Sequence, residues 1–186
     1  MSVMRLMTLP EVEAALWQEL GAAVADKGHE WRTPVLATVN RDAADARTVV
    51  LREVAQRERQ LLFYSDERAG KVGQLLQHSH GTVVMWSRRL GWQLRCRVRL
   101  ALEASGLAAT SRWARIKLTP AAQDYLSPLP PGAPLAEPLH AGSGAVARDY
   151  FAVISASVEA IDWLELHPDG HRRAIFDDQG ARWVQP

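Results

Sequence analysis

The sequence has very little cysteine. Cys96 is the only one among 186 residues, so an internal disulfide framework is excluded and a reducing, cytoplasmic location is expected. No run approaches the roughly 18 apolar residues of a membrane span. The N-terminal stretch MSVMRLMTLPEVEAAL meets acidic residues too early for the apolar centre of a signal peptide. These absences lead us to expect a soluble intracellular protein with no membrane partner.

Several catalytic and metal-binding motifs are missing as well. The chain contains no Gly-x-Ser-x-Gly elbow, no Walker loop and no Gly-x-Gly-x-x-Gly fingerprint. Neither His78 with His80 nor His167 with His171 has the spacing of a zinc site. Strand alternation puts Cys96 on an apolar face, which indicates a core residue rather than a nucleophile. We therefore expect no metal site and no Ser-His-Asp hydrolase.

Charge gives no support for a nucleic-acid-binding or membrane-surface protein, because 22 basic and 21 acidic residues leave a formal net charge of +1. The stretch WQLRCRVRL nevertheless places Gln93, Arg95, Arg97 and Arg99 on one face of a predicted strand. We expect that face to be solvated or to pair with acids of a second subunit. Binding of single-stranded nucleic acid, through these arginines and the nearby tryptophans, is a minor alternative.

Hydrophobic periodicity predicts a mainly β protein with helices, of the α+β class, in a single domain over residues 1–186. Thr8 is the predicted N-cap of a helix within residues 1–30. Strands are predicted at PVLATVN, ARTVVLREV, RQLLFYS, GTVVMWS and WQLRCRVRLALE, with one helix, AGKVGQLLQH, between the third and the fourth. Residues 104–150 are expected to form a helical and Pro-rich excursion, broken at Thr119-Pro120. FAVISASVEAIDWLELH, HRRAIFD and ARWVQP then return to strand character.

The junction FYSDERAGK, residues 63–71, places two cations where a strand passes into a helix. The first turn of a helix has unpaired backbone N–H groups and the positive end of the helix dipole, so it favours an anion. Arg68 and Lys71 are three residues apart and share one side of that turn. They are unusual at a helix start, where acidic residues are preferred, and a bound phosphate would explain them. The alternative is that Asp66 caps the helix and both cations face water.

The stretch RTVVLRE, residues 47–53, has an arginine near each end of an apolar strand. Such an arginine can bind a phosphate or a carboxylate through two parallel hydrogen bonds. An ordinary exposed strand end is the alternative. Alternation predicts two faces, one formed by Arg47, Val49 and Leu51 and the other by Thr48, Val50 and Arg52.

Taken in order, these pieces resemble the pyridoxamine 5′-phosphate oxidase family, the FMN-binding split β-barrels. RTVVLR is similar to the family's Arg-x-Val-x-Leu-Lys strand, FYSDERAGK to its strand-to-helix turn, and WQLRCRVRLALE to its Gln-bearing strand. The ending HRRAIFD…RWVQP is similar to the family's C-terminal strands. The resemblance covers residues 34–103 and 151–186. It implies an antiparallel six-stranded-type split β-barrel with peripheral helices, and a homodimer with FMN at the subunit interface.

The resemblance also implies which residues bind the cofactor. Arg47, Ser65 and Lys71, with Arg68 helping, would hold the FMN phosphate. The full set of implied FMN-binding residues is Arg47, Thr48, Val49, Val50, Leu51, Arg52, Tyr64, Ser65, Arg68, Lys71 and Gln93.

In the same resemblance, the strand backbone of residues 49–52 lies along the isoalloxazine ring, and Gln93 reaches the ring from the next strand. The flavin carries out the redox chemistry, its N5 accepting a hydride, so no catalytic side chain is assigned. Arg52 and Gln93 are candidates for tuning the ring through charge and hydrogen bonding. If the substrate is an anion, the available C-terminal cations are His171, Arg172 and Arg173.

Several departures separate this chain from the oxidases themselves. Gly70 stands where the family commonly has the first residue of its Arg-Lys pair, Arg52 replaces a Lys, and Ile175 replaces an Arg. SRWARIKLTPAAQDYLS lacks the Tyr/Arg/Ser pattern that grips the substrate phosphate, and the loop SPLPPGAP resembles a divergent subgroup. We therefore expect a dimeric FMN-dependent oxidoreductase whose substrate is open. The alternative is a protein of the same fold that binds FMN or another flat ligand without turnover.

Overall fold

The computed structural model describes residues 5–135, 137 and 150–186. Over these residues the chain forms one nine-stranded antiparallel sheet with helices around it. The elements are α1 (Leu9–Ala25), η1 (Glu30–Arg32), β1 (Val35–Asn40), β2 (Ala43–Thr48), β3 (Leu51–Ala55), β4 (Gln60–Asp66), α2 (Gly70–Gln77), β5 (His80–Ser87), β6 (Trp92–Glu103), α3 (Gly106–Ile116), η2 (Pro120–Tyr125), β7 (Phe151–Glu165), β8 (Arg172–Asp177) and β9 (Gly180–Val184). The predicted class, mainly antiparallel sheet with a few helices, is confirmed.

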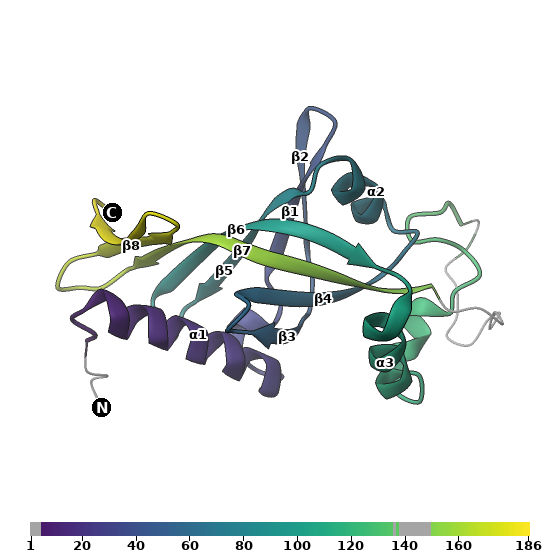
Figure 1. Ribbon diagram of the computed structural model, residues 1–186, viewed down its shortest axis with the longest axis horizontal. Helices are drawn as coiled ribbons and strands as arrows, with labels where there is room; N and C mark the ends of the chain where they lie inside the picture. Colours follow the sequence, from purple (N-terminus) through teal and green to yellow (C-terminus); the bar gives the residue numbers. More distant parts are fainter. Residues whose placement is uncertain (1–4, 136, 138–149) are drawn as a thin grey trace.

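The sheet has the order β2-β1-β5-β6-β7-β4-β3, and β8 and β9 continue from β7. β7 connects the two parts of the sheet. One edge of β7 pairs with the whole of β6, and its other edge pairs with β4 over residues 151–157 and with β8 over residues 161–165. Figure 1 shows β6 and β7 running along the molecule, with β8 at one end and α3 at the other. Functional side chains can therefore gather in two separate regions, one at each end of these two long strands.

The two ends of this strand order, β2 and β3, are consecutive in the chain and are joined only by Val49 and Val50. The sheet must therefore curl, since two residues can connect its opposite edges only if those edges come close together. The sequence predicts one strand over residues 46–54, and this is wrong. The break at Val49 and Val50 is the crossing from one edge to the other, so alternation does not assign the residues on either side of it to common faces.

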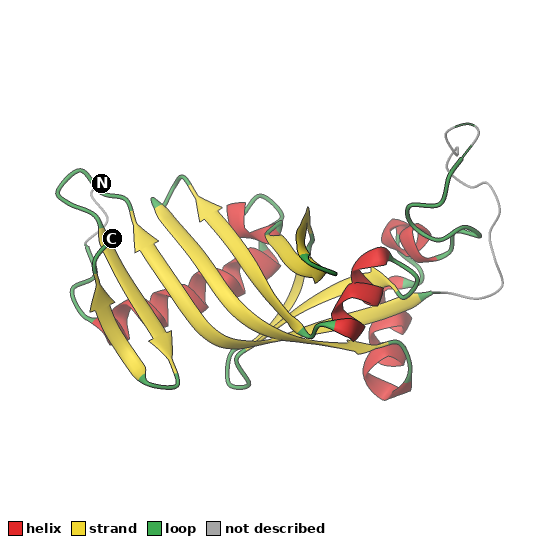
Figure 2. Ribbon diagram, turned by 90° about the horizontal axis from the view of Figure 1, so that it is seen from above, coloured by secondary structure: helices red, strands yellow, loops and turns green. Residues whose placement is uncertain are grey.

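The core lies between the sheet and α1, which packs across one face of the strands (Figure 2). α1 begins as predicted at Thr8, which forms a capping box with Glu11. Its buried residues Val12, Leu16 and Leu20 belong to the same cluster as the inner side chains of the strands. On β6 the side chains alternate between buried and exposed, so Cys96 faces the core as predicted. Burial raises the pKa of its thiol to about 12, which keeps the thiol protonated and unreactive.

A second, smaller cluster lies beneath α3 and η2. It contains Leu62, Tyr125, Phe151 and Val153, with Trp113 packed against them. The predicted break at Thr119-Pro120 is confirmed, because α3 ends at Ile116 and η2 starts at Pro120. Residues 136 and 138–149 of the predicted Pro-rich excursion lie outside the described residues. In the described part of the chain, no helix is long and apolar enough to span a membrane.

Candidate functional site

The junction between β4 and α2 forms a polar corner at one end of the sheet, which we call the β4–α2 corner and define as residues 65–71. Ser65 is buried near the end of β4, and Lys71 lies in the first turn of α2, with its Nζ 3.1 Å from Ser65 Oγ. The N-cap of α2 is Ala69, which has no side chain able to cap, and the first turn contains no acid. The corner therefore combines unshielded backbone donors with a cation.

Arg47 reaches the same corner from β2 and is fixed there by side chains that do not neutralise it fully. Its guanidinium donates to Leu36 O at 3.2 Å, to Thr38 Oγ1 at 2.6 Å and to Gln74 Oε1 at 3.0 Å. It also forms an ion pair with Asp45 at 2.7 Å, and the Asp45 side chain is 45% exposed. Gln74 lies about one helical turn after Lys71. The ammonium group of Lys71 and the Gln74 amide that holds Arg47 therefore lie on the same side of α2.

Like charges meet at this corner. Lys71 is half-buried, and burial lowers the pKa of its ammonium group, as does the neighbouring charge of Arg47. A lowered pKa means that the folded protein disfavours the charged form of Lys71 when no anion is present. A dianion placed between Lys71, Arg47 and the start of α2 would remove that conflict. The alternative expected from sequence does not hold for Lys71, which packs against Ser65 instead of facing water.

Arg68 is placed differently from its predicted partners. Its side chain forms two hydrogen bonds with Asp66, at 3.0 and 2.6 Å, and donates to the backbone oxygen of Ser127 at 3.0 Å. Asp66 Oδ1 also accepts from the backbone N–H of Arg68 at 2.7 Å, so Asp66 closes the turn before α2 and does not cap the helix. A role for Arg68 in phosphate binding stays a prediction, but here its donors are directed elsewhere.

The strand predicted to lie along the flavin ring has an open edge. In the described part of the chain β3 pairs only with β4, and the register shifts between Leu51 and Glu53, so Arg52 sits in a β-bulge. Bulges redirect side chains and are common beside binding sites. The N–H of Val49 is not available to a ligand, since it donates to Pro34 O at 2.9 Å. The buried Nε of Arg52 has no hydrogen-bond partner among the described residues, so it can donate to an acceptor.

Tyr64 faces the side of the sheet opposite to Ser65, toward α3. Its hydroxyl donates to Glu53 at 2.8 Å, and Glu53 accepts two further bonds of 2.8 Å from Arg112. Burial, followed by the hydrogen bond and charge of Glu53, raises the pKa of Tyr64 to about 12. Tyr64 is therefore a protonated donor, and Arg112 is held in an ion pair with Glu53.

Gln93 does not lie on a strand next to β3, and that part of the prediction is wrong within a single chain. Ser65 pairs with Ala152 near the start of β7, whereas Gln93 pairs with Leu164 near its end. The stretch from residue 152 to residue 164 corresponds to roughly 40 Å of extended strand. The reason is topological, since β6 and β7 are long and antiparallel and so carry the two groups at opposite ends.

The C-terminal cations lie beside Gln93 rather than at the β4–α2 corner. Arg173 is opposite Leu164, which is opposite Gln93, so all three share one face of the sheet. Arg173 forms two bonds of 2.9 and 2.7 Å with Asp162, and Arg172 forms two of 2.8 and 2.9 Å with Glu165. Each of the two arginines is thus held by a carboxylate, which it shares with Arg95 or Arg5, and its predicted contact with a substrate stays a prediction.

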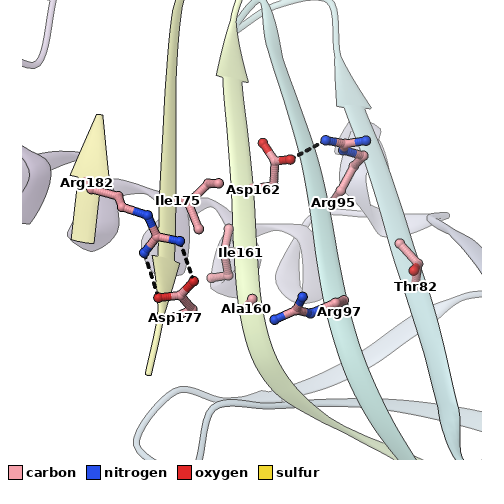
Figure 3. A pocket seen from close by; sticks show the side chains of 9 residues that line it. All are labelled: Thr82, Arg95, Arg97, Ala160, Ile161, Asp162, Ile175, Asp177 and Arg182. Carbon is pink, nitrogen blue, oxygen red and sulfur yellow. Dashed lines mark hydrogen bonds and ion pairs between the residues drawn. The ribbon is translucent and has the colours of Figure 1, made fainter. Parts of the chain in front are cut away.

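The arginine face of β6 contains a shallow pocket of about 310 Å³ over β7 and β8 (Figure 3). Arg95 pairs with Asp162, and Arg99 pairs with Glu159 at 3.1 Å, so two arginines of this face are paired with acids of the adjacent β7. The side chains of Arg95 and Arg99 are exposed, as expected for a solvated face, and pairing with a second subunit stays a prediction. In the described part of the chain Arg97 has no ion-pair partner. One remaining cation gives little support for a track along a nucleic-acid backbone.

Comparison with known proteins gives a family match and a shared fold. Residues 14–103 match the family model described as pyridoxamine 5′-phosphate oxidase, FMN-binding domain. The family predicted from the sequence is confirmed over this segment. The matched segment contains the β4–α2 corner and Gln93 but ends before α3. No curated protein matches the sequence.

Solved structures extend the likeness to the whole chain. A pyridoxamine 5′-phosphate oxidase-related, FMN-binding protein from Nostoc punctiforme is 21% identical, with a TM-score of 0.71 over 98% of this chain and 100% of the other. PhzG from Burkholderia lata is 15% identical, with a TM-score of 0.75 over 100% of both chains. At these identities the comparison establishes a shared fold.

Some site residues were not found from the sequence. Thr38 and Gln74 hold Arg47, and no sequence signal pairs a residue of β1 with one of α2. Gln74 could have been noticed, because it lies three residues after Lys71 and so shares its helix face. The Glu53–Arg112 pair could not, because it joins β3 to α3 across 59 positions of sequence.

Proposed function

We propose that the protein binds FMN, with the phosphate at the β4–α2 corner, and acts as an FMN-dependent oxidoreductase. The observation that carries the proposal is the placement of Lys71 beside Arg47 at the uncapped start of α2. Two cations that repel one another in the free protein are suited to a dianion. Ser65 Oγ, already 3.1 Å from Lys71 Nζ, adds a hydroxyl that can donate to a phosphate oxygen.

The residues along β3 suit a planar ring as well. The free edge of the strand offers backbone donors and acceptors, and Arg52 sits in the bulge with its guanidinium 5.5 Å from the centre of the Tyr64 ring. When bound, FMN supplies the redox chemistry. The chain holds the phosphate through Lys71, Arg47 and Ser65, and Arg52 can stabilise negative charge near the ring through its unpartnered Nε.

The functional form that we propose is a homodimer with FMN at the subunit interface. Gln93 and Arg173 lie at the far end of β7 from Lys71, so one chain cannot bring them to the same ligand. A second copy packed with its β6–β8 face against the β4–α2 corner would do so.

Reconstitution tests the cofactor proposal. The purified protein, mixed with FMN and passed through a desalting column, is expected to retain flavin with a perturbed visible spectrum. Incubation with pyridoxamine phosphate, and separately with tetrahydrophenazine-1-carboxylic acid, the compound bound in the Burkholderia lata PhzG structure, then tests turnover through flavin bleaching and peroxide release. Bound flavin that neither compound bleaches would favour the non-catalytic alternative, and a protein that retains no flavin would refute the proposal.

Dilution tests the homodimer. If each flavin is bound by two copies, FMN affinity must fall at protein concentrations where the dimer dissociates, because binding and association are linked. We expect flavin fluorescence, quenched in the complex, to recover on dilution over the same range in which sedimentation shows dissociation. A monomer that retains FMN with undiminished affinity would contradict the shared site.

A further inference from the structure

Arg68 joins the β4–α2 corner to a segment far away in sequence. Its guanidinium donates to the backbone oxygens of Ser127 at 3.0 Å and Pro128 at 3.4 Å, just after η2. Its central carbon lies 3.3 Å from the centre of the Tyr150 ring, at the entrance to β7. A bidentate pair with Asp66, whose side chain is 3% exposed, fixes the orientation of the guanidinium.

Backbone contacts extend this connection to η2. The N–H of Glu67 donates to Tyr150 O at 2.8 Å, and the N–H of Tyr150 donates to Tyr125 O at 3.0 Å. Tyr125 is buried in the aromatic cluster beneath α3, where its ring meets Phe151 edge to face at 5.2 Å. The position of η2, and with it one wall of the aromatic cluster, therefore depends on the turn that Arg68 occupies.

The β4–α2 corner thus has two sides that share one short turn. Ser65 and Lys71 face the candidate phosphate site, whereas alternation turns Asp66 to the side of η2. Asp66 also closes the turn itself, accepting from the N–H of Arg68 through its carboxylate and from the N–H of Ala69 through its backbone oxygen at 3.1 Å. Any ligand that fixes Ser65 and the first turn of α2 also fixes the place of Arg68.

We propose that Arg68 is a positioning residue that couples FMN binding to the docking of residues 120–135. The inference rests on the proposed function, because the ligand that fixes the corner is the FMN phosphate. Coupling is reciprocal, so the phosphate stabilises the docked segment and the docked segment strengthens FMN binding. Since η2 forms a wall of the aromatic cluster next to β4, a second ligand that binds beside this wall meets it in a more fixed position when FMN is bound.

Hydrogen exchange, followed by mass spectrometry on peptides covering residues 120–135, tests the coupling in the full-length protein. We expect saturating FMN to slow exchange there by about fivefold or more, and riboflavin, which has no phosphate, to have a much smaller effect. In Arg68→Met, FMN affinity should fall by no more than about fivefold, the factor by which the docked segment strengthens binding, because the altered side chain itself contacts no part of the phosphate site. The slowing by FMN should disappear.

Two further variants complete the test. Arg68→Lys keeps a charge opposite Asp66 but cannot reach both carbonyl oxygens, so it should fold normally and lose most of the slowing. Arg115→Met removes an exposed arginine on α3 and should change neither FMN affinity nor exchange.

Each result has a distinct meaning. An Arg68→Met affinity loss as large as that of Lys71→Met would make Arg68 a phosphate ligand and overturn the proposal. Persistent slowing in Arg68→Met, or wild-type protein that binds FMN without any slowing, would also overturn it while leaving the proposed function intact. Failure of the wild-type protein to bind FMN would refute the proposed function itself.

Discussion

Replacing Lys71 by methionine is expected to weaken FMN binding by roughly 1.5–3 kcal/mol, which is about 10- to 150-fold in the dissociation constant. The reason is the loss of a charge-assisted hydrogen bond to the phosphate at a site where Lys71 is already half-buried. Riboflavin should bind Lys71→Met and wild-type protein equally, because it lacks the group that Lys71 holds. Titration of each flavin by fluorescence quenching measures both effects.

The same variant should make the flavin-free protein more stable. The pKa of Lys71 is lowered in the folded protein, so its charge costs folding free energy at neutral pH, and an apolar side chain removes that cost. We expect a gain of about 0.5 kcal/mol or more in urea unfolding. Lys27→Met, at an exposed position after α1, should change neither stability nor affinity. Loss of both FMN binding and stability in Lys71→Met would instead make Lys71 a structural cation.

The pH dependence of FMN binding follows from the same group. Phosphate favours the charged form of Lys71, so binding takes up a proton wherever the free protein has lost one. From neutral pH, where the phosphate is a dianion, affinity should therefore be constant and then fall as the pH rises through the lowered pKa of Lys71 in the free protein. In Lys71→Met this alkaline decrease should be absent, and its persistence would assign the dependence to another group.

The contacts within each element were accessible from the sequence, because they depend on local spacing. The capping box of Thr8 and Glu11, the alternation of β6 and the break before Pro120 all follow from patterns shorter than twelve residues. The single strand expected over residues 46–54 failed, because apolar β-branched residues continue through the crossing at Val49 and Val50. Periodicity records burial, and both edges of a curled sheet are partly buried, so composition does not reveal where the chain changes edge.

The candidate site shows the same limit. Ser65 and Lys71 are six residues apart, and the strand-to-helix junction brings them together without any long-range information. Arg47 lies on a different strand, and it comes near them only through the pairing of β1 with β2 and the packing of α2. Only the family resemblance predicted that it belongs to the site. Gln93 was assigned to the next strand because the order of strands in the sheet was unknown. That order puts β5 and β1 between β6 and β2, and β7 and β4 between β6 and β3, so neighbours in motif order are not neighbours in space.

Replacing Glu165 by alanine is the change expected to destabilise the protein most among the charged residues of β7, by about 2–3 kcal/mol. Its side chain is 7% exposed and receives bonds of 2.8 and 2.9 Å from Arg172 and of 2.9 Å from Arg5. Alanine would leave two arginines without their acceptor. Arg172 also donates to Leu6 O at 2.6 Å, so the chain before α1 should loosen together with β8.

Glu159→Ala on the same strand provides the matched control. Glu159 pairs with Arg99, and their side chains are 35% and 60% exposed, so water replaces the lost contact and the change should stay below about 0.5 kcal/mol. Urea unfolding at neutral pH compares the two variants directly. Equal losses would mean that Glu165 contributes no more than a solvated ion pair, and that Arg172 is free to meet a ligand after all.

Acid provides an independent measure of the same cluster. Burial alone would raise the pKa of Glu165, but the hydrogen bonds and charges of Arg172 and Arg5 outweigh burial and lower it. A lowered folded-state pKa gives stability that is fully present above the unfolded pKa of about 4.3 and is lost as the pH falls through the folded value. The difference between Glu165→Ala and wild type should therefore shrink as the pH falls below about 4. A difference that stays constant into acid would show that packing, and not the ion pairs, accounts for the loss, and the neutralisation of Arg172 would then no longer explain why it is unavailable to a substrate.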